Sequence, residues 1–117
     1  MLPKKKEYVM MLRLFVDDIR NAPDPSWIVA RTYFEAIQCL RYLPIDVLSL
    51  DHDLGEYKTG YDVICWLEER VRSDPDYYSP RFICCHSANP VGKKKIEAAI
   101  KSIKDYEKKV LDMTRAK

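Results

Sequence analysis

Four short apolar runs alternate along the chain with longer segments in which hydrophobic residues recur every three or four positions. The apolar runs are typical of strands buried on both faces, and they occupy residues 12–16, 27–31, 45–50 and 81–85. The periodic segments, which follow the second, third and fourth runs, are typical of amphipathic helices. The pattern therefore predicts two strands and then three helices, with a strand between each pair of helices.

Three start signals place the predicted helices. Thr32 and Glu35 form a capping box, and Thr59 repeats the pattern with Asp62. Asn89, followed by a proline, is typical of an N-cap residue and opens the third and longest helix. The expected buried faces carry the following residues: Phe34, Ile37 and Leu40 in the first helix, Ile64, Leu67 and Val71 in the second, and Ile96, Ala99, Ile100, Ile103, Tyr106 and Val110 in the third.

The alternation of strands and helices predicts an α/β fold with a parallel sheet. Right-handed crossovers lead us to expect the strand order 2-1-3-4, with helices on both faces in a three-layer sandwich. A loop with two prolines at residues 19–26 replaces a first helix, so one face should be thinly covered near residues 23–27. We expect residues 1–117 to form a single domain with its core at about residues 12–113.

Composition narrows the function only slightly. The net charge of +2 does not favour nucleic acid or a membrane surface, and we interpret the lysine runs at residues 4–6 and 93–95 as solvated faces. No apolar run reaches the roughly 18 residues of a membrane-spanning helix, and we see no secretory leader. The four cysteines lack zinc-site spacing, so we expect small buried thiols in a cytoplasmic protein.

Acidic residues and both histidines directly follow three of the predicted strands. The first, third and fourth strands end in Asp17-Asp18, Asp51-His52-Asp53 and His86-Ser87. Because parallel strands present their carboxyl ends at one edge, where ligands bind, we expect these side chains to meet. Carboxylate oxygens suit Mg²⁺ or Mn²⁺, so the candidate metal ligands are Asp17, Asp18, Asp51 and Asp53. The alternative, that such carboxylates cap turns or helices, is strongest for Asp18 and Asp53.

The two histidines and four further polar residues complete the candidate site. His52 and His86 are candidate acid–base groups or metal ligands, although a lone histidine at a strand end is often structural. Arginine binds phosphate through its guanidinium group, and bare N–H groups at the start of the third helix attract an anion. The candidate phosphate contacts are Arg20, Arg31, Ser87 and Asn89. A turn role for Ser87 and an N-cap role for Asn89 stay open as alternatives.

These motifs resemble those of the cyclic-phosphate processing receiver domains, a divergent branch of the two-component receiver superfamily. The resemblance covers residues 12 to 100 and depends on Asp-His-Asp-Leu-Gly at 51–55 and His-Ser-Ala-Asn-Pro at 86–90 occurring together. It implies a receiver-like (flavodoxin-like) fold, truncated, and action on cyclic phosphates such as RNA ends left by cleavage. It also implies a magnesium and phosphoryl site that contains Asp17, Asp18, Asp51 and Ser87.

The chain departs from a signalling receiver in three ways. A loop replaces the helix between the first two strands, and no fifth strand carrying a lysine follows Ser87. His52 and His86 are additional to the signalling pattern. These departures argue against phosphorelay signalling, and the histidines favour acid–base hydrolysis.

We therefore expect a metal-dependent phosphoesterase that acts on cyclic phosphates, such as RNA 2′,3′-cyclic phosphate ends or cyclic nucleotides, with Mg²⁺ or Mn²⁺ as cofactor. His52 and His86 would transfer protons, and either water or Asp51 would attack the phosphorus. The expected partner is a phosphate-containing small molecule or an RNA end, without a membrane. The alternative is a non-enzymatic receiver-like regulatory module that binds metal or nucleotide.

Overall fold

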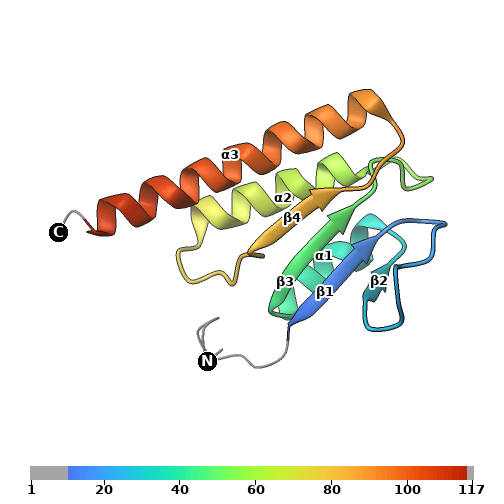
Figure 1. The fold of residues 1–117 in the computed structure, drawn as a ribbon, viewed down its shortest axis with the longest axis horizontal. Coiled ribbons are helices and arrows are strands. Elements are labelled where there is room, and N and C mark those ends of the chain that lie inside the picture. The colour runs from blue at the N-terminus through green and yellow to red at the C-terminus, as the bar shows by residue number, and fades with distance from the viewer. Residues whose placement is uncertain (1–10, 116–117) are drawn as a thin grey trace.

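The computed structural model describes residues 11–115 of the chain (Figure 1). Its elements follow the predicted order: β1 (Leu12–Val16), β2 (Ile28–Ala30), α1 (Tyr33–Tyr42), β3 (Ile45–Leu50), α2 (Gly60–Ser73), β4 (Phe82–Cys85) and α3 (Pro90–Arg115). The predicted lead-in at residues 1–10, with its lysine run, lies outside the described residues. None of the described helices is long and apolar enough to cross a membrane.

The four strands form one parallel sheet in the order β2-β1-β3-β4, which confirms the prediction. The last residues of the strands stand side by side, because Val16 pairs with Ala30 and with Leu50, and Leu50 pairs with Cys85. The chain therefore leaves all four strands along one edge of the sheet, at the arrowheads in Figure 1. The polar residues that follow β1, β3 and β4 are brought to this edge.

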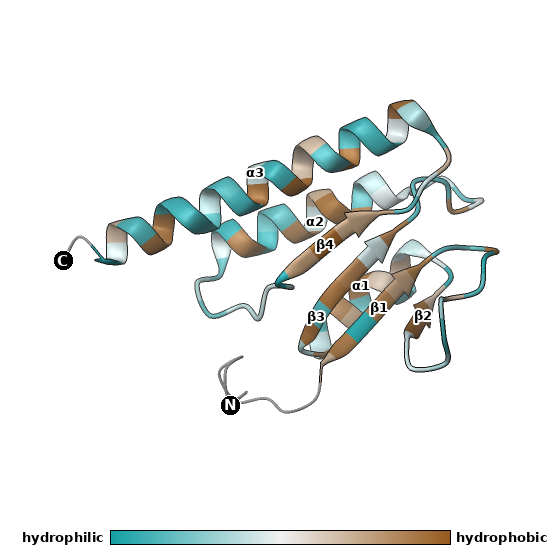
Figure 2. Cartoon of the chain, viewed as in Figure 1, coloured by the Kyte–Doolittle hydropathy of each residue, from teal (hydrophilic) through white to brown (hydrophobic). Residues whose placement is uncertain are grey.

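The hydrophobic core lies on one face of the sheet. Alternate strand residues such as Leu14, Val16, Leu48 and Leu50 point to this face and are completely buried. They belong to the same cluster as the buried residues of the helices, which are Ala36, Ile37 and Leu40 of α1, Val63, Ile64 and Leu67 of α2, and Ile96, Ala99 and Ile103 of α3. Figure 2 shows the corresponding pattern, with hydrophobic strands and helices of mixed hydropathy.

All three helices lie on this same side, which corrects the expected three-layer arrangement. The β2–α1–β3 and β3–α2–β4 crossovers step in the same direction across the sheet, so the right-handed rule places α1 and α2 on one face. Both lie behind the strands in Figure 1, and α3 packs against α2 and β4. The β1–β2 connection steps the other way, but it is a loop. The opposite face therefore has no helix among residues 11–115.

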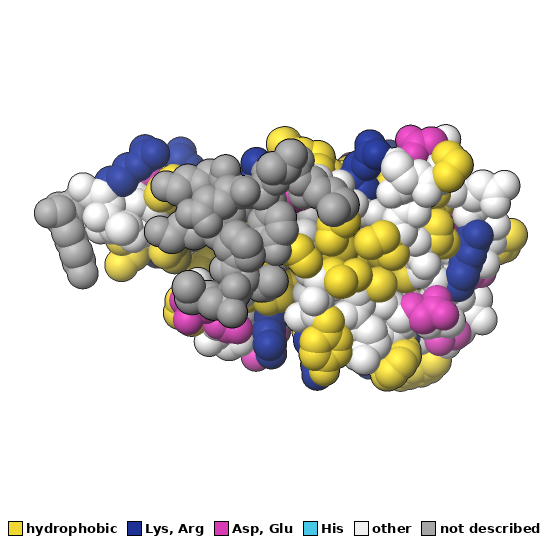
Figure 3. All heavy atoms as spheres, turned by 90° about the horizontal axis from the view of Figure 1, so that it is seen from below, with side chains coloured by type: hydrophobic (Ala, Val, Ile, Leu, Met, Phe, Trp, Pro, Cys, Tyr) yellow, Lys and Arg dark blue, Asp and Glu magenta, His cyan; other side chains and the backbone are white. Residues whose placement is uncertain are grey.

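This helix-free face carries the other set of alternate strand residues, among them Phe15, Phe82 and Cys84. Phe15 is buried, because the ring of Trp27 meets it edge-on with centroids 6.0 Å apart and the ring of His86 stacks on it. Phe82 remains 58% exposed, and Cys84 is exposed as well. Hydrophobic side chains also gather on the underside of the molecule (Figure 3). The helix-free face is therefore open along β4, at Phe82 and Cys84, whereas Phe15 of β1 is covered by the rings of Trp27 and His86.

The three helices begin at the predicted caps. The Thr32 hydroxyl accepts a hydrogen bond from the Glu35 N–H at 3.1 Å. The Asp62 carboxylate accepts one from the Thr59 N–H at 2.7 Å. The side-chain oxygen of Asn89 accepts one from the backbone N–H at the third position of α3, at 3.0 Å. Each of these contacts satisfies a backbone N–H group at the start of a helix that would otherwise lack a partner.

Two expected helix-face residues are exposed, while Val71, Ile100 and Tyr106 are partly buried. Phe34 is 68% exposed, because at 3.6 residues per turn it lies roughly 110° around α1 from the centre of the buried face. Val110 is 42% exposed, since the last turns of α3 extend past the sheet in Figure 1. The core contribution of α3 therefore ends at Ile103, its last fully buried residue.

The cysteines also differ from expectation. Cys85 is buried and Cys39 is half-buried, but Cys65 and Cys84 are exposed. Desolvation raises the pKa of the Cys85 thiol, as expected for a thiol that serves as a small apolar side chain. All four cysteines are unpaired.

Candidate functional site

Three polar residues meet where β1, β3 and β4 end. Asp17, Asp51 and His86 each directly follow the last residue of one of these strands. One carboxylate oxygen of each aspartate and one ring nitrogen of the histidine all lie within 4.8 Å of one another. Because side chains alternate along a strand, all three stand on the side that carries Phe15 and Cys84, the helix-free face. We refer to them as the Asp17–Asp51–His86 group.

Asp17 is held in one orientation by backbone donors. Its side chain is almost completely buried, and its Oδ1 accepts hydrogen bonds from the N–H groups of Ile19 at 2.9 Å and Arg20 at 2.8 Å. Its Oδ2 lies 3.0 Å from His86 Nε2. Desolvation raises the pKa of Asp17, but the two N–H donors and the histidine outweigh it and lower the pKa below its ordinary value. The carboxylate is therefore ionised at neutral pH.

His86 has a partner at each ring nitrogen. Nε2 faces Asp17, and Nδ1 lies 2.7 Å from the hydroxyl oxygen of Ser49. The imidazole stacks on the Phe15 ring, with centroids 4.3 Å apart and planes 4° from parallel. The side chain is 20% exposed. The position and plane of this ring are thus determined from three directions.

Asp51 is positioned through its backbone and through a glycine. Its N–H donates to Val16 O at 2.9 Å, which extends the β1–β3 pairing to the group, and its Oδ1 accepts from the His52 N–H at 2.8 Å. The start of α2 approaches closely, because a Cβ at Gly60 would collide with the carbonyl oxygen of Asp51. Gly60 therefore lets helix α2 begin directly against the metal-ligand candidate Asp51.

Asp18 and Asp53, two of the predicted metal ligands, lie outside the Asp17–Asp51–His86 group. Asp18 is half-buried beside Gly55, where an added Cβ would lie 2.7 Å from its Oδ2. Gly55 also has a φ of 67°, so both its conformation and this contact favour glycine. Asp53 is 66% exposed at its side chain, and a hydrogen bond with His52 is the main cause that lowers its pKa.

His52, a predicted acid–base residue, is turned toward α3. A Cβ at Gly92 would collide with its imidazole ring, so the ring packs against the first turn of that helix. Its Nδ1 lies 2.9 Å from Asp53 Oδ1, and Asp53 in turn is 3.4 Å from the amide nitrogen of Asn89. The structure therefore does not bring the two histidines together at one group.

The two arginines differ in position. The half-exposed Arg20 lies at the rim of the group, with Nε 3.9 Å from Asp17 Oδ2 and Nη1 donating to His86 O at 2.9 Å. Arg31 donates from Nη1 to the backbone carbonyls of Asp17 at 3.0 Å and Arg20 at 2.6 Å. Arg20 is therefore placed to meet an anion, whereas Arg31 braces the loop that follows β1.

The polar residues that follow His86 have local partners. Ser87 is buried, and its hydroxyl accepts a hydrogen bond from the Asn89 N–H at 3.0 Å. Asn89 caps α3 through its side-chain oxygen, which accepts from the Gly92 N–H. Ser87 therefore makes the contact expected of a turn residue and Asn89 that of an N-cap. The side-chain amide nitrogen of Asn89 also lies 3.4 Å from Asp53 Oδ2.

Sequence reasoning overlooked two residues that shape the group, Ser49 and Phe15. Ser49 is 6% exposed and contacts His86, and Phe15 provides the surface on which the His86 ring lies. A signal for Ser49 was present, since a hydroxyl residue two positions before Asp51 in an apolar strand shares its face. The stacking of Phe15 depends on strand order and had no local signal.

The Asp17–Asp51–His86 group has the donor chemistry of a divalent-cation site. It offers two carboxylates and one imidazole, and carboxylates suit Mg²⁺ and Mn²⁺ whereas an imidazole suits softer divalent metals. Asp17 Oδ2 and His86 Nε2 face each other, while Asp17 Oδ1 is held by backbone donors. The residues present could therefore hold a metal ion without rearrangement of the strands.

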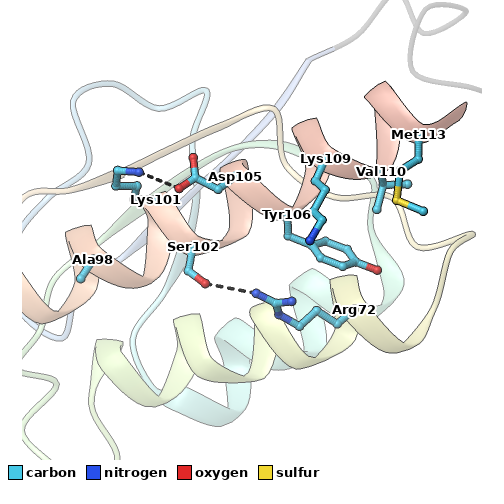
Figure 4. A pocket seen from close by; sticks show the side chains of 9 residues that line it. All are labelled: Arg72, Ala98, Lys101, Ser102, Asp105, Tyr106, Lys109, Val110 and Met113. Carbon is cyan, nitrogen blue, oxygen red and sulfur yellow. Dashed lines mark hydrogen bonds and ion pairs between the residues drawn. The ribbon is translucent and has the colours of Figure 1, made fainter. Parts of the chain in front are cut away.

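A pocket of about 730 Å³ lies elsewhere, between the end of α2 and the C-terminal half of α3 (Figure 4). Its polar side chains already pair with one another, since Lys101 contacts Asp105 and Arg72 contacts Ser102. The pocket contains no member of the Asp17–Asp51–His86 group. It is thus a surface hollow between two helices and separate from the strand-end site.

The comparisons with known proteins agree with the strand-end motifs. Searches of curated proteins and of solved structures found no match. A family model described as the cyclic-phosphate processing receiver domain matches residues 12–102. This range runs from β1 into α3 and includes all of Asp17, Asp51 and His86. The chain therefore belongs to the family of cyclic-phosphate processing receiver domains.

Proposed function

We propose that this domain is a phosphoesterase that binds one divalent cation through Asp17, Asp51 and His86 and opens cyclic phosphates. The observation that carries the proposal is that three strands deliver two carboxylates and an imidazole with donor atoms within 4.8 Å. The family description, which refers to cyclic-phosphate processing, supports the class of substrate. RNA 2′,3′-cyclic phosphate ends and cyclic nucleotides are the substrates that we propose.

The proposed reaction is hydrolysis of one ring ester. Water attacks the phosphorus, one ring P–O bond breaks, and the released alkoxide takes up a proton, so that a phosphate monoester and a free hydroxyl result. A bound divalent cation supplies Lewis acidity toward the phosphate oxygens and lowers the pKa of water. In one route Asp51 accepts the proton of the attacking water and passes it to the alkoxide; in the other Asp51 attacks the phosphorus itself, the ring P–O bond breaks, and water then hydrolyses the aspartyl-phosphate to release the monoester. Mass spectrometry of the protein during a single turnover distinguishes these routes.

His86 and Arg20 also have roles in the proposed reaction. His86 acts through Nε2 as a ligand, in an orientation that Ser49 at Nδ1 and the Phe15 ring hold. The imidazole favours Mn²⁺ over Mg²⁺, because Mg²⁺ prefers oxygen ligands. Arg20, half-exposed at the rim, contributes a positive charge for the phosphate oxygens.

A screen of substrates tests the proposal directly. Nucleoside 2′,3′-cyclic phosphates, 3′,5′-cyclic nucleotides and RNA with cyclic phosphate ends are incubated with the protein and Mg²⁺ or Mn²⁺, and products are followed by ³¹P NMR. We expect a monoester only with protein and metal together, and none with the Asp51→Asn variant. Metal binding without conversion of any substrate would contradict the enzymatic proposal.

A second candidate function is a non-enzymatic receiver-like module that regulates a partner by binding a metal ion or nucleotide. The observation that favours it is the position of His52, which packs against Gly92 and leaves one histidine instead of two in the Asp17–Asp51–His86 group. Binding without turnover in the same screen supports this alternative. For either function, we propose a reducing compartment such as the cytoplasm, because all four cysteines are unpaired.

A further inference from the structure

A chain of polar contacts leads from the Asp17–Asp51–His86 group into the middle of the sheet. Asp17 Oδ2 lies 3.0 Å from His86 Nε2, and His86 Nδ1 lies 2.7 Å from Ser49 Oγ. Cys84 Sγ lies 3.5 Å from the same hydroxyl oxygen. Ser49 is 6% exposed and is the last residue but one of β3, an inner strand of the sheet. The buried hydroxyl of Ser49 thus contacts the imidazole of His86 on one side and the Cys84 thiol on the other.

The ring protons of His86 depend on what Nε2 contacts. A neutral imidazole has one N–H, and an ionised carboxylate only accepts hydrogen bonds. In the neutral ring, a contact of Nε2 with Asp17 therefore requires the proton on Nε2, so that Nδ1 accepts a hydrogen bond from Ser49. When Nε2 binds a cation, the proton must instead be on Nδ1, which then donates. A hydroxyl suits both states because it both donates and accepts.

We infer that Ser49 is a positioning residue that lets His86 exchange its contact with Asp17 for a metal ion while Nδ1 keeps a hydrogen-bond partner. This inference rests on the proposed function, because it takes His86 as a metal ligand. Such partners behind a ligating histidine fix its tautomer and orientation. An alanine at position 49 would remove the hydroxyl partner of Nδ1 in either state of this half-buried ring, whereas a threonine would keep the hydroxyl.

Ring NMR of the wild-type protein tests the tautomer exchange. In ¹H–¹⁵N spectra of the metal-free protein we expect the His86 proton on Nε2. With Zn²⁺ as a diamagnetic substitute for Mn²⁺ we expect it on Nδ1, in slow exchange with solvent. A proton that remains on Nε2 in the metal-loaded protein would overturn the inference, and this measurement needs no variant.

Variants at position 49 test the role of the hydroxyl. Ser49→Ala should bind Mn²⁺ roughly 10- to 100-fold more weakly, as is typical when the partner of a metal-bound histidine is lost, and Ser49→Thr should restore most of the affinity. Cys84→Ala is the matched control, since it removes the other neighbour of the hydroxyl on the same face and should leave the affinity within about twofold of the wild type. Melting temperatures of all variants report folding.

The outcomes separate this inference from the proposed function. If the wild type binds no Mn²⁺, the proposed metal site is wrong and the inference is wrong with it. If the wild type binds Mn²⁺ and Ser49→Ala binds equally well, only the inference is wrong. Weaker binding by Ser49→Ala together with rescue by Ser49→Thr supports it.

Discussion

Asp17 and His86 are 69 positions apart in the chain, yet Asp17 Oδ2 and His86 Nε2 lie 3.0 Å from each other. The strands that they follow, β1 and β4, are not neighbours, because β3 lies between them. Their side chains therefore meet across the end of β3, at the place where Asp51 leaves that strand. The contact closes a group of three residues from three strands, and its chemistry depends on the whole sheet.

Loss of either carboxylate should weaken metal binding. Asp17→Asn and Asp51→Asn each remove a negative charge from the group, so we expect Mn²⁺ affinity to fall in isothermal calorimetry. In the wild type, Mn²⁺ at 100 times its Kd should raise the free energy of unfolding by about 2.7 kcal/mol, because the ion binds only the folded state. Thermal melts with and without Mn²⁺ measure this gain.

Asp53→Asn is the control for these variants, because Asp53 is exposed and lies outside the group. We expect it to retain wild-type Mn²⁺ affinity. A loss equal to that of Asp51→Asn would show that Asp53 is a ligand, as the sequence predicted. Melting curves that do not respond to Mn²⁺ in any of the proteins would contradict the metal site altogether.

The two histidines should behave differently when replaced. His86→Ala should lower both Mn²⁺ affinity and turnover of a cyclic phosphate, because it removes a member of the group. His52→Ala should keep Mn²⁺ affinity and most of the turnover, since its ring packs on α3. Steady-state kinetics and calorimetry on the same preparations decide the matter. A fall in kcat by roughly 10²–10⁴ in His52→Ala, with intact metal binding, would restore it as an acid–base residue.

Two glycines provide a comparison of steric effects. A Cβ at Gly60 collides with the backbone carbonyl of Asp51, whereas one at Gly92 collides with the side chain of His52. We expect Gly60→Ala to destabilise by about 1–3 kcal/mol, the usual cost of overpacking, and to weaken Mn²⁺ binding through Asp51. Gly92→Ala should cost less, because an imidazole rotates away more easily than a strand end moves. Urea unfolding and calorimetry give both quantities.

The two faces of the sheet should differ in their response to truncation. Leu48 is completely buried on the helix-covered face, and Leu48→Ala should cost about 2–5 kcal/mol because it leaves a cavity. Phe82 on the helix-free face is 58% exposed, and Phe82→Ala should cost less than about 1 kcal/mol. If Leu48→Ala and Phe82→Ala lost equal free energies of unfolding in urea titrations, both faces of the sheet would have to be covered in solution.

Stability should fall at alkaline pH through Tyr77. Desolvation raises the pKa of Tyr77, with a smaller opposing effect of Arg70, and its hydroxyl donates to Leu40 O at 2.8 Å. The pKa of Tyr77 is higher in the folded than in the unfolded protein. Its contribution to the free energy of unfolding is therefore complete below about pH 10, the ordinary pKa of tyrosine, and is lost as the pH rises through the folded-state pKa. Above pH 10, the free energy of unfolding of Tyr77→Phe should therefore fall less steeply than that of the wild type.

The matched control for this variant is Tyr57→Phe, since Tyr57 is 94% exposed. Its free energy of unfolding should fall above pH 10 as that of the wild type does, as measured by chemical unfolding at several pH values. At neutral pH, Tyr77→Phe should lose about 1 kcal/mol with its hydrogen bond, and Tyr57→Phe should lose nothing measurable. A decline in Tyr77→Phe as steep as in the wild type would contradict the assignment.

Local patterns predicted most of the fold. The capping residues Thr32, Thr59 and Asn89 marked the helix starts because side-chain caps act over three residues, and the apolar runs located the strands. The two-layer arrangement was missed although the same strand order implies it. Both crossovers proceed in one direction, and the helix that would return over the other face is replaced by a loop.

The candidate site was predicted less completely than the fold. Asp17, Asp51 and His86 were found because strand ends of a parallel sheet share an edge. The positions of Asp53 and His52 depend on how the β3–α2 loop packs against α3, where Gly92 admits the imidazole. Ser49 could have been placed on the same face as Asp51, two positions on, but its contact with His86 depends on the pairing of β3 with β4.

The loop that replaces a first helix changes what covers Phe15. In a sheet covered on both sides, an aliphatic side chain from a helix would lie there, but here the imidazole of His86 lies flat on the ring at 4.3 Å. A residue of the proposed site is therefore also part of the packing between β1 and β4. Selection at His86 should consequently act on folding as well as on the proposed site, so that sequence changes are better tolerated at the half-exposed Arg20 on the rim than at this imidazole.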